Sequence, residues 1–252
     1  IVGVIMKFAF WILVCLTSVI TDTFCQRLPT GIEACRKDDP QRNDCILQTL
    51  TNLLPLMKDG NNLGLPTIDP IAFDGLPFKY DTPQTKLTFT LKKGTCYGFG
   101  QTQIKRVRTQ ITDEEWRFHI DIFVPRVFIE AKYRGQGNIN GMNLGSKGDF
   151  NVTATGLSGT MKVRGKLEQI SGNEFWKVSS VELVPKVKGL RTYIEGLVPD
   201  PELNRIALEF VNEYIAQNRN DLLKETRLFF DPLITPIANA ITLRIPAKNL
   251  LV

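Results

Sequence analysis

The chain has 252 residues, of which 43% are hydrophobic and 23% charged, and its formal net charge is +5. These fractions are typical of a folded globular protein and exclude an intrinsically disordered chain. The charge is mildly positive but lacks the dense lysine and arginine stripe of nucleic-acid-binding proteins, so we expect no nucleic-acid partner.

The first 25 residues have the pattern of a secretory signal peptide. Met6 and Lys7 precede a short apolar run, and a more polar stretch ends near Cys25. The apolar run is shorter than the roughly 20 residues that span a membrane. Residues 1–5 stand before Met6, which suits an initiator, and we interpret them as an artefact of translation. We expect secretion to the extracellular space, a single domain over residues 26–252, and no stable membrane anchor.

The cysteines and one sequon fit a secreted protein. We predict that Cys35 and Cys45, which lie close together at the start of the mature chain, form a disulfide. Cys96 is then a buried free thiol. If Cys25 is retained, a Cys25–Cys96 bridge is an alternative that nothing else supports. Asn151 begins an Asn-Val-Thr glycosylation sequon, a short motif that also matches by chance.

A helix and an extended connector follow the predicted disulfide. Asp44 is suited to cap the helix, and apolar residues repeat at helical spacing from Ile46 to Met57. Pro55 is expected to interrupt the last turn. Residues 61–81 are rich in glycine and proline, which predicts an extended connector with short edge pairings.

From about residue 82 to residue 184 apolar and polar residues alternate, which predicts β-strands. Strands are expected at residues 87–91, 118–124, 127–130, 150–155, 159–169 and 175–183. Turns are expected at residues 113–114, 141–148, 156–158 and 172–173. Short turns between consecutive strands imply an antiparallel meander, and the lack of intervening helices argues against a doubly wound α/β fold.

From about residue 201 the pattern becomes helical again. One apolar stripe begins at Leu203, and a second apolar segment runs from Leu222 to Ile241. Pro232 and Pro236 must kink or restart this second helix. Because the segment is apolar over much of its circumference, we expect it to be enclosed. The predicted fold is therefore α+β, with an N-terminal helix and a highly curved antiparallel β-sheet wrapped around a long C-terminal helix.

The sequence lacks the residue patterns of common catalytic and metal sites. His119 is the single histidine and has the polar parity of a predicted strand, so we interpret it as solvent-facing. One histidine without a matching cysteine spacing supplies no metal site, and no Gly-x-Ser-x-Gly elbow accompanies it. The glycines around Gly135 miss the dinucleotide-binding spacing. We expect no enzymatic activity, no metal and no cofactor.

Several groups of residues occur in a characteristic order. They are Leu28-Pro29 followed by Cys35 and Cys45, Gly64-Leu65-Pro66 with Ile68-Asp69-Pro70-Ile71, Pro125 to Tyr133 followed by Gly135, and Phe210-Val211-Asn212-Glu213-Tyr214. Together, over residues 28–250, they resemble the insect haemolymph juvenile-hormone-binding protein and Takeout family. The chain departs from that family where the usual Gly-Leu-Ser is replaced by Cys96 to Gly100, and where Pro232 and Pro236 crowd the last helix. These departures put the shape of one end of the cavity in question.

The resemblance implies a tubular lipid-binding fold, in which a curved sheet and a long helix enclose an apolar tunnel. It implies a secreted haemolymph carrier of juvenile hormone, another terpenoid or a fatty-acid-like lipid, with links to biological rhythms. It also implies the Cys35–Cys45 disulfide, because both positions match. A small hydrophobic ligand is the expected partner, and a monomer is favoured.

The residues expected to line the tunnel are inward-facing apolar positions of the strands and of the last helix. They are Phe89, Phe118, Ile120, Ile122, Val127, Ile129, Phe229, Phe230, Leu233, Ile237 and Ile241. Binding would rest on the transfer of apolar ligand surface out of water. Periodicity does not separate a hollow interior from a packed one, so in the alternative interpretation the same residues fill a core.

Two other functions compete with the carrier. One is a secreted protein of the same fold that acts on membrane or microbial lipid surfaces through the basic strand from Lys105 to Arg108. We interpret that strand as a solvated sheet edge, and salt-sensitive sedimentation with liposomes would distinguish the two. The other is a secreted enzyme with an unrecognised site, whose activity would depend on His119.

Overall fold

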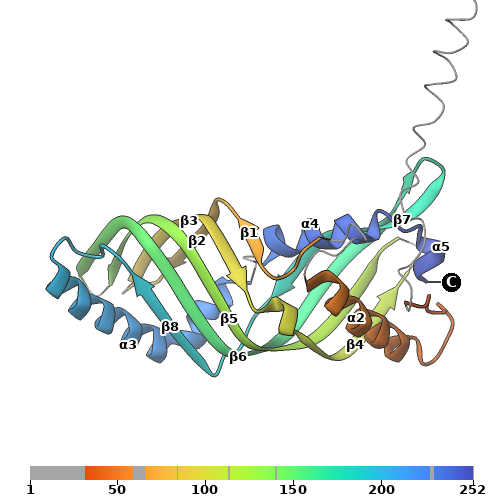
Figure 1. The fold of residues 1–252 in the computed structure, drawn as a ribbon, viewed down its shortest axis with the longest axis horizontal. Helices are drawn as coiled ribbons and strands as arrows, with labels where there is room; N and C mark the ends of the chain where they lie inside the picture. Colours follow the sequence, from red (N-terminus) through yellow and green to blue (C-terminus); the bar gives the residue numbers. More distant parts are fainter. Residues whose placement is uncertain are drawn as a thin grey trace, which may run out of the picture.

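Figure 1 shows the fold in a computed structural model that describes residues 32–58, 66–83, 85–112, 114–139, 141–227 and 230–251. The molecule is elongated. Helix α3 (Pro201–Glu225) lies along one half of its length, and helix α4 (Asp231–Thr242) lies along the other. The expected signal peptide lies outside the described residues.

The strands form one eight-stranded antiparallel sheet. They are β1 (Ile71–Phe73), β2 (Leu76–Asp81), β3 (Thr85–Tyr97), β4 (Gln103–Ile111), β5 (Trp116–Ile139), β6 (Met142–Ile170), β7 (Asn173–Leu183) and β8 (Gly189–Ile194). The long strands β5 and β6 pair along the whole of β5 and form the spine of the sheet. A short 3₁₀ helix, η1 (Phe99–Gln101), joins β3 to β4.

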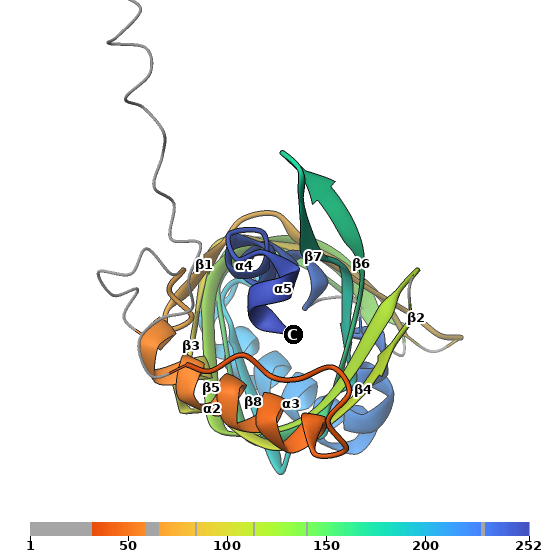
Figure 2. The ribbon, with the colours of Figure 1, turned by 90° about the vertical axis from the view of Figure 1, so that its right-hand side faces the viewer.

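The flanking strands divide the sheet into two halves. In the half beside α3, called the α3 half below, β3 pairs with the C-terminal part of β5 and β8 with the N-terminal part of β6. In the half beside α4, called the α4 half, β4 pairs with the N-terminal part of β5 and β7 with the C-terminal part of β6. Figure 2 looks along the molecule and shows the sheet curving around the C-terminal helices, as predicted.

Two of the expected turns are wrong, because β5 and β6 are single long strands. The expected turn at residues 156–158 lies inside β6, and of the expected turn at 141–148 only the part next to Gly141 is a turn. Pro125 and Gly156 lie between the pairs Val124–Leu157 and Arg126–Thr155. Proline has no backbone N–H to donate, and Gly156 has a φ of +60°, so the ladder is irregular here while the strands continue.

The C-terminal region contains two long helices rather than one, with a break where the prolines predicted a restart, and a short helix, α5 (Ala247–Leu250), follows them. Asp200 caps α3 by accepting a hydrogen bond from the N–H of Leu203 at 2.9 Å. Pro232 lies in the first turn of α4, where a missing N–H costs nothing. The side chain of Asn239 then fastens α4 to β7, because it accepts from the N–H of Val178 at 2.8 Å and donates to its carbonyl at 3.0 Å.

The N-terminal helix α2 (Arg42–Lys58) packs against β4. It begins before Asp44, which lies in the first turn rather than at the cap, and Pro55 does not interrupt it. The Arg42 guanidinium donates to Thr109 Oγ1 at 3.1 Å, and the Thr109 hydroxyl donates to Asn43 at 2.9 Å. These bonds position α2 across the outer strand of the α4 half.

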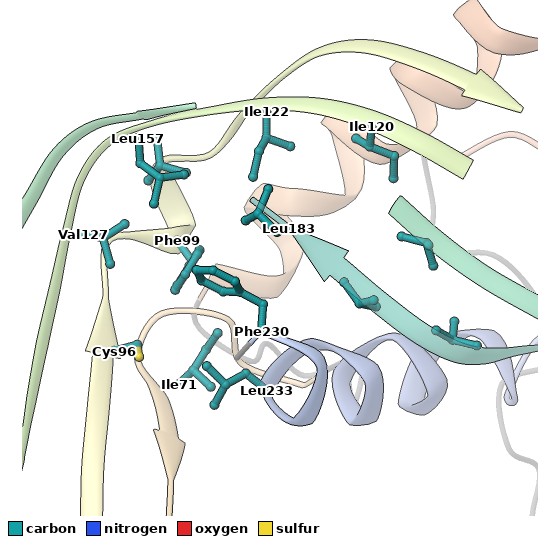
Figure 3. Close-up of a cluster of buried hydrophobic side chains, with 14 of the residues drawn as sticks. Ile71, Cys96, Phe99, Ile120, Ile122, Val127, Leu157, Leu183, Phe230 and Leu233 are labelled. Atoms are coloured by element: carbon teal, nitrogen blue, oxygen red, sulfur yellow. The ribbon is translucent and has the colours of Figure 1, made fainter. Parts of the chain in front are cut away.

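The α4 half encloses a packed core. Val124, Val181 and Leu183 are at most 1% exposed. Beyond them, Trp116 and Trp176 meet edge to face with ring centroids 5.4 Å apart, an arrangement that fills space efficiently. Figure 3 shows part of this core, with side chains of β5 and β7 gathered around the start of α4.

The predicted disulfide between Cys35 and Cys45 is confirmed. It lies beside the short C-terminal helix α5 (Ala247–Leu250), where the Cys35 N–H donates to the Leu250 carbonyl at 3.2 Å. Cys96 is a free thiol with no exposed surface, and burial raises its pKa to about 12. This thiol remains protonated at physiological pH and behaves as a small apolar side chain.

Replacing both Cys35 and Cys45 with serine should lower the free energy of unfolding by about 2–3 kcal/mol, because the bridge closes a short loop in the unfolded chain. Urea denaturation followed by circular dichroism measures the change. Adding a reductant should destabilise the original chain by the same amount and leave the double variant unaffected. Equal stability of the two proteins without reductant would show that the bridge contributes nothing.

Candidate functional site

A cavity of about 260 Å³ lies in the α3 half, between the inner face of the sheet and α3. Alternate residues of three strands line it: Leu87, Phe89 and Leu91 of β3, Phe150, Val152 and Ala154 of β6, and Leu190, Thr192 and Ile194 of β8. A spacing of two residues places each set on one face of its strand. The wall is therefore the apolar face that alternation predicts, and almost no polar atom faces the cavity.

Glycines of β5 make room for large side chains on β3. Gly135 is paired with Phe89, and Gly137 with Leu87. A Cβ atom added at Gly135 would overlap the Cβ of Phe89, and one added at Gly137 would overlap the Leu87 side chain. Both pairs border the cavity, and the glycines allow β3 to bring its large side chains close to β5.

One face of α3 closes the cavity on the side opposite the sheet. Its lining residues are Val211, Tyr214, Ile215, Leu222 and Leu223, spaced as one face of a helix. Asn212 holds this helix to β8: its side chain accepts from the N–H of Thr192 and donates to the Thr192 carbonyl, both at 2.9 Å. Asn212 plays the same part on α3 that Asn239 plays on α4.

The few hydroxyl groups at the wall belong to hydrogen bonds within the protein. Tyr133 donates to the backbone carbonyl of Glu195 at 2.7 Å. Burial, with a smaller effect of the Glu195 carboxylate, raises the pKa of Tyr133. The Thr85 hydroxyl, which is 1% exposed, donates to the Tyr214 hydroxyl at 2.7 Å. No lysine, arginine or histidine is among the lining residues that the structure describes.

The structure brings part of the expected tunnel lining together. Phe89, Val127, Ile129 and Phe230 all line the cavity. Phe230 reaches it from the start of α4, at the junction of the two halves. Phe89 comes from β3, Val127 and Ile129 come from β5, and Phe230 comes from the chain between the helices. Their part in ligand binding remains a prediction.

The other expected residues do not line this cavity. Phe118, Ile120 and Ile122 have the correct inward parity but lie on the N-terminal part of β5, where the α4 half is packed. Leu233, Ile237 and Ile241 lie on α4, where Leu233 is buried and Ile237 packs against the same core. Phe229 lies outside the described residues. Parity placed these side chains on the correct face but did not distinguish the halves.

Several lining residues were missed by the sequence analysis. Leu190 and Ile194 alternate on β8, a strand too short to stand out between the long meander and the helices. Tyr214, Leu222 and Leu223 belong to the apolar helical stripes that the sequence predicts. The predicted tunnel lining did not include these three residues. The available signal for Tyr214 was its place in the segment Phe210 to Tyr214, which belongs to the family resemblance.

The remaining candidate residues of the sequence lie away from the cavity. No group of three histidine, cysteine, aspartate or glutamate side chains among them is arranged to hold a metal ion. His119 is partly exposed on β5, in register with Arg108 and Lys162 of the neighbouring strands. Asn151 is partly exposed on β6, and its glycosylation stays a prediction. Within the part of the chain that the structure covers, no helix has the length and apolar character needed to cross a membrane.

The fold is similar to that of Takeout 1 from Epiphyas postvittana, with a TM-score of 0.63 and 19% identity over 87% of this chain and 99% of that chain. A lipopolysaccharide binding protein matches with a TM-score of 0.34 and 14% identity over 79% of this chain and 38% of that chain. No curated protein sequence matches. The sequence profile described as haemolymph juvenile hormone binding protein matches residues 10–252.

Substituting Gly135 with alanine should lower the free energy of unfolding by about 1–3 kcal/mol, because the new methyl group meets Phe89 and the backbone of β3. Gly145→Ala is the matched control, since a Cβ there lies 3.4 Å from the nearest atom, and its stability should change by less than about 0.5 kcal/mol. Thermal and urea unfolding measure both. Equal effects of the two substitutions would contradict the tight Gly135–Phe89 pairing.

Proposed function

The chain belongs to the haemolymph juvenile hormone binding protein family, and on that premise we propose that it is an extracellular carrier that holds one small apolar molecule in the cavity between α3 and the sheet. The observation that carries the proposal is the cavity itself, whose wall is apolar almost throughout. A family of binding proteins and a site without reactive groups both favour transport over catalysis.

The physical basis of the proposed binding is the removal of apolar surface from water. Each 100 Å² of apolar ligand surface that enters the cavity contributes about 2.5 kcal/mol before the costs of association. The cavity volume of about 260 Å³ is close to the lower end of ordinary ligand pockets, which starts at roughly 300 Å³. This size supports one terpenoid or one acyl chain, and it argues against a lipid with several chains.

The proposed ligand classes are juvenile hormone, another terpenoid, or a fatty-acid-like lipid. The proposed location is outside the cell, because disulfides such as Cys35–Cys45 form and persist in oxidising compartments. We place a single ligand in the α3 half, because in the α4 half the buried rings of Trp116 and Trp176 occupy the interior in mutual contact.

Ala154→Phe tests the proposal directly, because Ala154 faces the cavity from the centre of β6 and a phenyl ring would occupy ligand space. Displacing about 60 Å² of apolar contact costs about 1.5 kcal/mol, so the affinity for a fluorescent apolar probe should fall about tenfold or more. Fluorescence titration measures the dissociation constants.

Ala216→Phe is the matched control, since Ala216 is exposed on α3 and its substitution adds the same ring outside the cavity. This control should bind the probe like the original chain. Circular dichroism establishes that both variants are folded. A folded Ala154→Phe variant with unchanged affinity would place the binding site elsewhere and contradict the proposal.

A further inference from the structure

The two halves of the sheet meet at a seam where β6 changes partners. On one side of β6, β8 pairs with it as far as Thr155, and β7 pairs with it from Met161 onward. The segment of residues 184–188, called the seam connector below, joins β7 to β8. Ser158 of β6 and Lys186 of the connector exchange both backbone hydrogen bonds, at 2.8 and 2.7 Å. The connector therefore completes the sheet between β7 and β8.

The seam connector forms part of the cavity wall, and there the wall is a single layer of chain. Pro185 and Val187 are buried and line the cavity between α3 and the sheet. Val184 and Lys186 alternate with them, are exposed, and line a groove on the outer side. Because neighbouring residues of an extended segment point to opposite faces, the cavity and the groove lie on the two sides of the same stretch of chain.

The groove has a volume of about 900 Å³, and four separate segments of the chain each contribute a basic side chain to it. These side chains are exposed, and they are Lys105 of β4, Lys162 of β6, Lys186 of the seam connector and Arg227, which follows α3. Two acidic side chains, Asp121 and Glu182, also line the groove. The Asp121 carboxylate is engaged by the Arg108 guanidinium at 2.9 Å. The groove therefore keeps a positive balance of charge.

Apolar side chains lie among these cations. Phe123 and Val184 line the groove, and Val184 is 42% exposed. The Lys105 amino group lies 5.9 Å from the centre of the Phe123 ring. Cations beside exposed apolar groups suit the surface of an anionic membrane, where phosphates lie next to glycerol and acyl carbons. An inorganic anion would engage the cations alone, so the presence of both kinds of side chain favours a membrane.

The basic strand from Lys105 to Arg108 contributes to this groove only in part. Lys105 lines it, whereas Arg108 is held by Asp121. Lys162 and Arg227 come from later parts of the chain, so the groove is a feature of the tertiary structure that the basic strand alone does not predict.

We propose that this groove docks the chain on an anionic phospholipid membrane, with lipid phosphate groups among Lys105, Lys162, Lys186 and Arg227. Docking there places the seam connector, a single layer of chain over the cavity, against the lipid surface. A ligand then passes between membrane and cavity at the connector. The docking stands on the groove alone, whereas the passage of a ligand rests on the carrier function proposed above.

Sedimentation of the full chain with lipid vesicles tests the docking. Vesicles of phosphatidylcholine alone should leave the chain in solution, whereas vesicles that also contain phosphatidylserine should bind it. Raising the salt concentration to about 1 M, where the Debye length is about 3 Å, should release the chain from them. Equal binding to both kinds of vesicle, or binding to neither, would overturn the proposal.

Variants that remove charge locate the contact. Each basic residue near an anionic membrane strengthens binding about fivefold, so Lys162→Gln combined with Lys186→Gln should weaken it about 25-fold. Lys86→Gln combined with Lys92→Gln is the matched control, because both residues are exposed on β3 and the same charge is lost outside the groove. Charges remote from the contact are screened, so the control should change binding by less than about twofold.

Circular dichroism establishes that both double variants are folded. An equal loss of binding in the two would show that the overall charge of the chain, and not the groove, holds the membrane, and it would overturn the assignment.

The rate at which a fluorescent apolar probe moves from vesicles to the chain tests the passage of a ligand. Transfer should be faster from vesicles that contain phosphatidylserine, and the variant at Lys162 and Lys186 should lose this acceleration. The same rate from both kinds of vesicle would contradict passage at the connector. A chain that binds anionic vesicles but takes up no probe would refute the carrier function and leave the docking intact, so the two failures are distinct.

Discussion

The structure depends on the need to cover the concave, apolar face of one strongly curved sheet. The spine strands β5 and β6 run the length of the molecule, and most of their described inward residues are apolar. Two helices cover this face, and each is fastened by an asparagine whose side chain replaces a missing ladder partner: Asn212 at Thr192 and Asn239 at Val178. Such bonds satisfy edge groups that would otherwise be buried without partners.

The two halves share this plan but differ in what fills the space. In the α4 half the sheet contributes Trp116, Phe118 and Trp176, whose rings pack together against a helix that is itself apolar. In the α3 half the spine carries Gly135 and Ala154 at inward positions. Phe89 of β3 occupies the space beside Gly135, and the small side chain of Ala154 borders the cavity. A single sheet thus builds a packed core and an apolar cavity side by side.

The sequence predicted the class of the fold because period-two alternation and helical stripes are strong local signals. The curved antiparallel sheet, the N-terminal helix and the Cys35–Cys45 bridge follow from those signals and from the family resemblance. The prediction of a turn at residues 156–158 was wrong, because proline and glycine, here Pro125 and Gly156, are local signals for turns. Here they lie opposite each other across two continuous strands. That pairing depends on the tertiary structure, which the local sequence pattern does not contain.

The candidate site was predictable only in part for a related reason. Alternation reports which face of a strand is inward, so it selected Phe89, Val127 and Ile129 correctly as cavity-facing. It selected Ile120 and Ile122 by the same rule, although they face a packed core. Whether an inward residue meets a void depends on the helix across the sheet and on the small residues beside it, neither of which the local pattern contains.

The most direct test of the central claim is the location of xenon in crystals of the protein under pressure, because xenon enters dry apolar cavities. The account predicts xenon between α3 and β6, beside Ala154, and none between α4 and β7, beside Trp176. Density for a copurified lipid at the same place beside Ala154 would agree equally well. Side chains filling the space beside Ala154, with neither xenon nor lipid, would contradict the account.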